Sequence, residues 1–225
     1  MKSNLLKQMF IFVVILSFTN GNAQNYFPLM SNQNKEILRK TFSSFKTITI
    51  TEEEKISLLL DTAFNNKIDS FSNTWYSGHL LVLEEPVIYS DSTNIEIIRF
   101  TWLRTFHNPI IIRIVNNEEI VFIYWKKSNG AGGYNPGNLI VNEKKRIESQ
   151  QWTEIVQKLE KSKFWEISTN YPRFGLDGAQ WILEAKIGNK YHVVDRWSGD
   201  DSEIGQFCLD LLKMTDLKIK KREIY

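Results

Sequence analysis

The feature that most constrains the fold is the dipeptide Gly188-Asn189, which lies between two runs of alternating apolar and polar residues. Glycine at the first central position suits a type II′ turn in a β-hairpin. A two-residue turn fixes the register, because each residue before it must face the residue equally far after it. The sequence therefore predicts that Trp181 faces Arg196 and that Leu183 faces Val194.

The two faces of this hairpin differ in character, because successive side chains of a strand point to opposite sides. The expected core face carries Trp181, Leu183, Ala185, Ile187 and Val194. Arg196 lies at the edge of that face, where its guanidinium is a cation–π candidate for Trp181. The other face is mixed and carries Gln180, Ile182, Glu184, Lys186, Tyr191, Val193, Asp195 and Trp197.

The polar residues of the hairpin form the candidate site. The candidate binding residues are Asp177, Glu184, Tyr191, Asp195, Arg196 and Trp197. Glu184 and Asp195 are expected to be diagonal neighbours, and two close carboxylates can serve as an acid and a base. Carboxyl groups about 5–9.5 Å apart across an open cleft would favour glycan hydrolysis. The same residues can instead pair with Lys186 and an arginine of a neighbouring strand, and burial of both carboxylates against Lys or Arg would exclude the hydrolase.

The remaining polar motifs have structural explanations. Asp177 lies in a Gly-Leu-Asp-Gly turn, where its side chain can bond its own backbone. Acidic residues at 200, 201 and 203 precede a predicted helix and favour its positive end. Their spacing does not match a calcium loop, and the three histidines have no zinc-binding spacing. We therefore expect no metal and no cofactor.

A glycine-rich loop over residues 129–137 is the second motif. Such loops can hold phosphate groups, but the nucleotide-binding versions lead from a strand into a helix. This loop leads into another predicted strand and lacks the Walker lysine. We expect a long turn whose glycines let the backbone approach the protein's own sheet.

Hydrophobic periodicity gives the rest of the fold. It predicts helices at 35–45, 52–66, from Ser149 and at 202–214, and strands at 80–83, 87–89, 95–106, 110–115, 120–125 and 139–141. Strands that follow one another through short turns pair antiparallel. The expected fold is α+β, an antiparallel sheet of about six to eight strands with helices packed mainly on one face. Residues 24–225 form one domain in this interpretation; a division into 24–148 and 149–225 is the alternative.

Residues 1–23 have the pattern of a secretory signal peptide. Lys2 and Lys7 precede an apolar run, and small residues at Gly21 and Ala23 predict cleavage after Ala23. The run is shorter than the roughly 20 residues of a membrane span, although an uncleaved N-terminal anchor is the alternative. The only cysteine is Cys208, so the chain is not expected to be a lipoprotein. These observations predict a periplasmic or secreted protein.

Charge and motif content exclude several functions. Removing residues 1–23 leaves 26 basic and 26 acidic residues. A balanced charge without a long basic run is not expected of a nucleic-acid-binding protein. No G-x-S-x-G sequence marks a nucleophile elbow.

The segment LDGAQWILEAKIGNKYHVVDRWS resembles a signature shared by a family of uncharacterised exported bacterial proteins. The resemblance extends to GAGGYNPGNLI and to the Trp152–Trp165 segment, so it covers roughly Arg99 to Leu212. Related sequences usually have Pro where Gly199 stands and Gly where Ala185 stands. The resemblance implies an exported protein and supplies no activity.

Three functions follow from these patterns. The leading hypothesis is a binding module, without catalytic residues, for a cell-envelope component, a small ligand or a protein. The alternative is a glycan hydrolase that uses Glu184 and Asp195. The third is an assembly protein, which would expose an apolar patch of several hundred Å².

Overall fold

The computed structural model describes residues 24–225 except 45–50, 172–174, 176 and 200. The helices are α1 (Asn32–Ser44), α2 (Glu52–Leu60), α3 (Ser70–Val82), α4 (Ser149–Lys161) and α5 (Glu203–Lys213), with short 3-10 turns at Phe164–Glu166 and Lys221–Glu223. The strands are β1 (Glu96–Arg104), β2 (Ile110–Asn116), β3 (Val121–Ser128), β4 (Leu139–Ile147), β5 (Ala179–Ile187) and β6 (Lys190–Trp197). The predicted signal peptide and its cleavage point lie outside the described residues.

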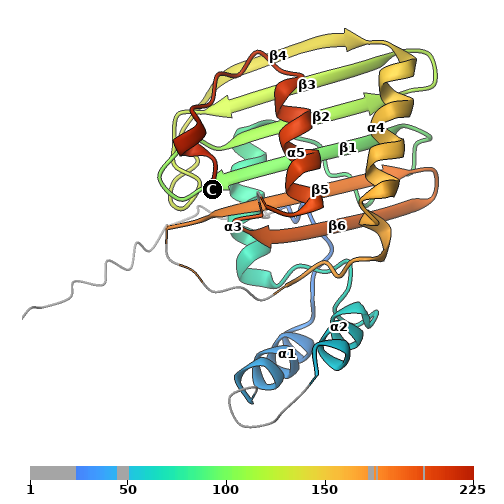
Figure 1. Cartoon of the computed structure of the whole chain (residues 1–225). Helices are drawn as coiled ribbons and strands as arrows, with labels where there is room; N and C mark the ends of the chain where they lie inside the picture. Colours follow the sequence, from blue (N-terminus) through green and yellow to red (C-terminus); the bar gives the residue numbers. More distant parts are fainter. Residues whose placement is uncertain (1–23, 45–50, 172–174, 176, 200) are drawn as a thin grey trace, which may run out of the picture.

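The six strands form one antiparallel sheet in the order β4-β3-β2-β1-β5-β6 (Figure 1). This confirms the predicted α+β class. The hairpin register is also confirmed, because Trp181 pairs with Arg196 and Leu183 pairs with Val194. Gly188 has φ +55, as the first central position of a type II′ turn requires.

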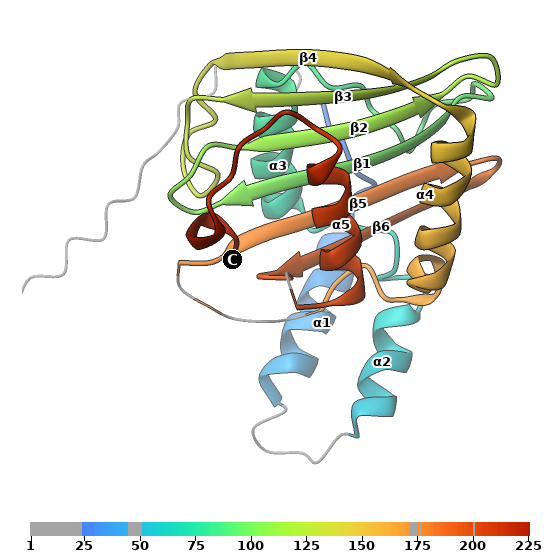
Figure 2. The same cartoon turned by 45° about the horizontal axis from the view of Figure 1, so that its top comes forward.

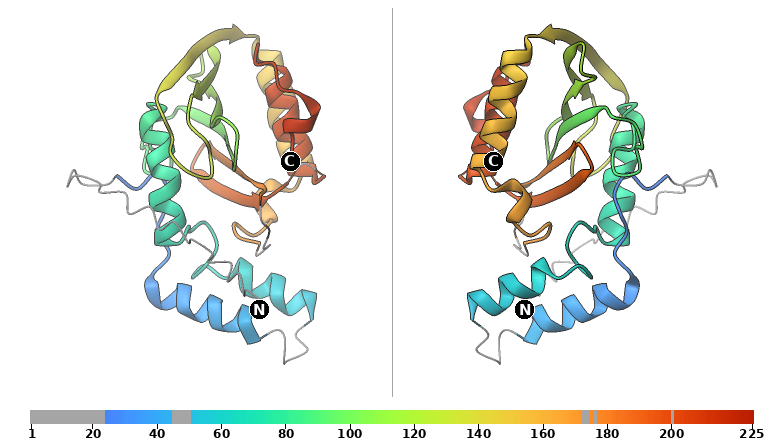
Figure 3. Two further views of the ribbon diagram at one scale, coloured as in Figure 1. Left: turned by 90° about the vertical axis from the view of Figure 1, so that its left-hand side faces the viewer. Right: turned by 90° about the vertical axis from the view of Figure 1, so that its right-hand side faces the viewer.

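Helices cover both faces of the sheet, as the edge-on views in Figure 3 show. The α4/α5 face carries the larger core, in which Trp102 and Trp181 lie 4.9 Å apart between ring centroids. The α3 face carries a second core around Ile182 and Val193. The mixed face of the hairpin is therefore partly buried as well, which limits how many of its polar groups can reach a ligand.

The predicted strands at 80–83 and 87–89 are wrong, because residues 70–82 form α3 and residues 87–89 lie in a loop. Asp69 caps this helix by accepting hydrogen bonds from the backbone N–H groups of its first turn. Its buried face includes Asn73 and Ser77, which bond the buried segment around Tyr26 and Phe27. Polar residues at buried helix positions hid the apolar stripe. Tyr26 and Phe27 are themselves part of the core.

Several other boundaries differ from prediction. Helix α2 ends at Leu60 and not at residue 66, and it begins with a capping box formed by Thr51 and Glu54. Strand β4 continues to Ile147. The prediction ended it at residue 141, because residues 142–146 are polar and show no alternation of apolar and polar side chains. Phe106 lies beyond the end of β1 and is 57% exposed.

Helices α1 and α2 stand together away from the sheet, as Figure 2 shows. Ile37 and Ile56 on these helices are largely exposed. Among the described residues, no helix has the length and hydrophobicity needed to cross a membrane.

Candidate functional site

Glu184 forms a fully buried ion pair on the face of the sheet that α3 covers. It lies directly across from Arg99 in the β1–β5 ladder. The Arg99 Nε and Nη2 groups donate to Glu184 Oε2 at 2.8 and 2.5 Å, and both side chains are fully buried. The Tyr191 hydroxyl donates to Oε1 at 2.9 Å. Glu184 therefore pairs with an arginine of a neighbouring strand, which is the structural arrangement that the sequence left open.

The ion pair belongs to a larger charged network that holds residues 83–95 against the sheet. Arg99 Nη1 donates to the Pro86 carbonyl at 2.7 Å. Glu85 accepts from Arg113 Nε at 2.8 Å and lies 3.2 Å from Lys126 Nζ. Burial lowers the pKa of Arg99, but the Glu184 and Glu85 carboxylates outweigh it and raise that pKa above its ordinary value. These charges stabilise residues 83–95 on the sheet. The side chains of Glu85, Arg99 and Glu184 are fully buried and have no access to a ligand.

Asp195 has a different partner from Glu184. Its Oδ2 atom accepts a hydrogen bond from the Tyr76 hydroxyl of α3 at 2.9 Å. Burial raises the pKa of Asp195 to about 6, and the Tyr76 hydrogen bond opposes this shift. The two carboxylates thus serve separate contacts, one with β1 and one with α3. This arrangement does not favour the glycan hydrolase.

Substituting Asp195 by asparagine should remove a pH dependence of stability. The folded pKa of about 6 lies above the ordinary 3.8, so Asp195 stabilises the fold at acid pH and loses this contribution as pH rises through 6. The difference in unfolding free energy between wild type and Asp195→Asn should fall by about 2 kcal/mol between about pH 4 and pH 8, allowing for partial exposure.

Urea titrations at several pH values measure this difference. Burial lowers the pKa of His79 and of His192 to about 4, and both histidines are present in both proteins, so their contributions cancel. Parallel stability curves for the two proteins would contradict the assigned role of Asp195.

The other three candidate residues lie apart from this pair. Arg196 projects to the α4/α5 side, donates to the carbonyls of Ser168 and Thr169, and lies 5.9 Å over Tyr171. Trp197 packs on the turn before β5, where a Cβ at residue 178 would lie 2.4 Å from its ring. Asp177 is exposed with φ +63. The structure therefore does not bring the six predicted residues into one cavity.

Two surface hollows within the described residues involve other side chains. One lies between α4 and α5 around Ile155 and Phe207, and another lies on α2 around Ile56 and Leu60. Neither is lined by any of the six candidates. Across the described part of the chain, no cluster of three or more His, Cys, Asp or Glu side chains is arranged to hold a metal ion.

The glycine-rich loop approaches the sheet, as predicted. Gly132 N–H donates to the His107 carbonyl at 3.0 Å, and Gly133 N–H donates to the Thr105 carbonyl at 3.2 Å. A Cβ on Gly132 would lie 2.5 Å from the backbone of Leu103 and Arg104. The glycines are needed for this close packing.

A cluster of basic and aromatic side chains, which the sequence did not predict, lies on the α3 face of the sheet beside residues 83–95. We call it the β3–β4 strip: Arg113, Phe122, Tyr124, Lys144 and Arg146. The register places Arg113, Tyr124 and Lys144 in one row across three strands, and Phe122 and Arg146 in the next. The alternation of Phe122 and Tyr124 against the buried residues of β3 was a usable signal. The full length of β4 gave no such signal, because its polar residues do not alternate with apolar ones.

Aromatic rings hold the cations of the strip in place. Lys144 Nζ lies 5.2 Å from the ring centroid of Phe122 and 5.9 Å from that of Tyr124. The Arg113 guanidinium carbon lies 4.5 Å from the Tyr124 centroid. Both rings are half-buried, whereas Lys144 and Arg146 are exposed. The strip presents ordered positive charge beside aromatic surface.

The fold and this strip define an antiparallel α+β protein with one basic, aromatic sheet surface. No protein-family model matches the chain, and no curated protein matches it either.

Proposed function

We propose that the chain is an exported binding module that recognises an anionic partner in the cell envelope through the β3–β4 strip. The observation that carries this proposal is the position of Lys144 over two aromatic rings on an uncovered part of the sheet. The signal-peptide pattern and the resemblance to exported bacterial proteins support the cell envelope as its location.

The chemistry of the strip favours an anion. Lys and Arg side chains make charge-assisted hydrogen bonds with carboxylates and phosphates. Cation–π contacts of about 0.5–1 kcal/mol each at exposed sites reduce the freedom of the cations, which lowers the cost of ordering them on binding. Without residues 1–23 the chain has equal numbers of acidic and basic residues, so the basic character belongs to the strip and not to the whole protein.

Anionic polymers test the proposal directly. The full chain should bind polyglutamate and polygalacturonate more tightly than uncharged dextran, and binding should weaken as salt is raised. The double substitution Lys144→Glu/Arg146→Glu should lower the affinity at least tenfold at low salt, because it replaces two attractions by two repulsions. Fluorescence anisotropy with labelled polymers measures each affinity.

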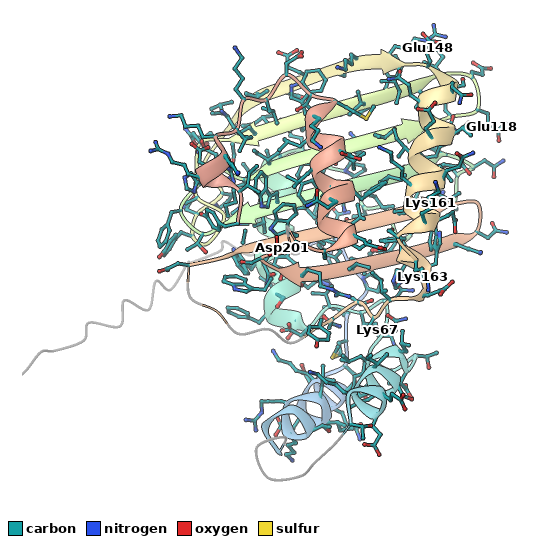
Figure 4. The ribbon with its side chains drawn as sticks, in the orientation of Figure 1. Lys67, Glu118, Glu148, Lys161, Lys163 and Asp201 are labelled. Carbon is teal, nitrogen blue, oxygen red and sulfur yellow. The ribbon has the colours of Figure 1, made fainter. Side chains whose placement is uncertain are left out.

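The matched control reverses two charges elsewhere. Lys161 and Lys163 are exposed at the end of α4, as Figure 4 shows. The Lys161→Glu/Lys163→Glu variant changes net charge by the same amount and should bind as wild type does. Equal losses in the two variants would indicate a general charge effect and would overturn the assignment to the strip.

A further inference from the structure

The two edges of the sheet differ, because other segments of the chain hydrogen-bond to the outer side of β6. The Tyr191 carbonyl accepts from Asn66 Nδ2 at 3.1 Å, and the Val193 N–H donates to Asn66 Oδ1 at 3.0 Å. The Asp195 N–H donates to the Thr169 carbonyl at 2.8 Å. One asparagine and one short segment therefore occupy the outward carbonyl of Tyr191 and the outward N–H groups of Val193 and Asp195.

The register shows which backbone groups of β4 point outward. In a two-residue hairpin the residues flanking the turn exchange both backbone hydrogen bonds, so Ile187 and Lys190 form such a pair. Hydrogen-bonded and non-hydrogen-bonded pairs alternate along every antiparallel ladder. When this alternation is followed from β6 to β4, the backbone N–H and C=O groups of the odd-numbered β4 residues point toward β3. The outward N–H and C=O groups are those of Asn142, Lys144 and Arg146, whereas Ile140 lies at an irregularity where Ser128 pairs with Leu139.

The β4 edge is open along its regular part. Within the part of the chain that the structure describes, no hydrogen bond reaches the outward backbone groups of Asn142, Lys144 and Arg146. Figure 1 shows β4 as the outermost strand with no strand or helix alongside it. It is nine residues long and contains no proline. An open edge of this length is a template for another extended chain.

We propose that an extended acidic segment of another polypeptide pairs with β4 as an additional strand. The inference rests on the proposed function, because Lys144 and Arg146 serve both, and it names the partner as a polypeptide. Backbone hydrogen bonds supply affinity in strand addition, and alternate side chains supply specificity. Carboxylates on one face of the incoming strand would lie opposite Lys144 and Arg146, where opposite charges are favourable.

The charge of β4 argues against a second copy as the occupant. The strand carries Lys144, Lys145 and Arg146 against a single acid, Glu143. Two such strands side by side would bring like charges together, which destabilises the pairing. An acidic segment would place negative charges beside these positive ones, which favours pairing, so it is the proposed occupant of the edge.

A proline at an outward position separates strand addition from charge attraction. Asn142→Pro removes an outward N–H and leaves the hydrogen bonds of β4 to β3 intact. Asn142→Thr is the matched control, because it keeps the N–H and favours a strand. The probe is a blocked nine-residue peptide of alternating valine and glutamate, compared with the same peptide N-methylated on every second residue.

The unmethylated peptide should bind the full chain and the Thr variant, and should bind the Pro variant at least tenfold more weakly. In NMR exchange experiments the peptide should slow exchange of the Asn142, Lys144 and Arg146 amides. Both methylation frames should be made, and one of them should abolish binding. The free protein should sediment as a monomer, and pairing of two copies through β4 would overturn the acidic occupant.

Equal binding to the Pro and Thr variants, with anionic polymers still bound, would overturn strand addition and leave the proposed function standing. Binding of the peptide without any binding of polygalacturonate would support strand addition and narrow the partner to polypeptides. Failure of every anionic probe would overturn both proposals.

Discussion

Replacing Arg99 by methionine is expected to lower the free energy of unfolding by about 3–5 kcal/mol, because it leaves a buried carboxylate without its counter-charge. Glu184 is fully buried, and Arg99 supplies two of its hydrogen bonds. The loss also releases the carbonyl of Pro86, which anchors the segment over the sheet. Urea unfolding monitored by tryptophan fluorescence measures the change in midpoint at constant slope.

The double variant Arg99→Met/Glu184→Met provides the control. Removing both partners of a buried pair is often far less costly than removing one, because no isolated charge remains. We expect the double variant to recover most of the loss. A loss below about 1 kcal/mol in the single variant would show that Glu184 is neutral or hydrated when Arg99 is absent.

The second large effect is expected at Gly132. An alanine Cβ there would lie 2.5 Å from two backbone atoms of β1 and 2.6 Å from a third. Backbone atoms cannot turn aside as the end of a flexible side chain can, so the loop must move and lose its hydrogen bond to the His107 carbonyl. Overpacking of this kind costs about 1–3 kcal/mol, and we expect the upper end of that range for Gly132→Ala.

Gly78 is the matched site for this substitution. It lies inside α3, and apart from its chain neighbours and the backbone of the helix itself no atom would lie within 4 Å of an added Cβ. Gly78→Ala should therefore stabilise the protein by up to about 1 kcal/mol, because alanine has the higher helix propensity. Equal and small effects at both positions, measured by thermal unfolding, would contradict the close packing of the glycine loop.

The local part of the fold was predictable from the sequence, and the non-local part was not. The Gly188-Asn189 turn alone fixed the hairpin register, since residues near a tight turn have only one way to pair. The partner of Glu184 was out of reach, because β1 and β5 are neighbours in the sheet and 75 residues apart from the end of one strand to the start of the next. Helix α3 was missed because Asn73 and Ser77 occupy buried positions where an apolar residue is expected.

The candidate site shows the same division. The mixed face of the hairpin was identified correctly from its alternation, but its polar groups turned out to bond other parts of the protein. The β3–β4 strip depends on the pairing of Tyr124 with Lys144, which could not be predicted while β4 was thought to end at residue 141.

The difference between the two edges of the sheet determines how many partner strands can add to it. A protein with two open edges can join neighbours on both sides and grow into a fibre, whereas a protein with one open edge offers only one place for strand addition. If a partner strand adds to β4 as proposed, the contacts of Asn66 and Thr169 along β6 restrict strand addition to that one edge. We expect one-to-one complexes whose size does not increase with concentration.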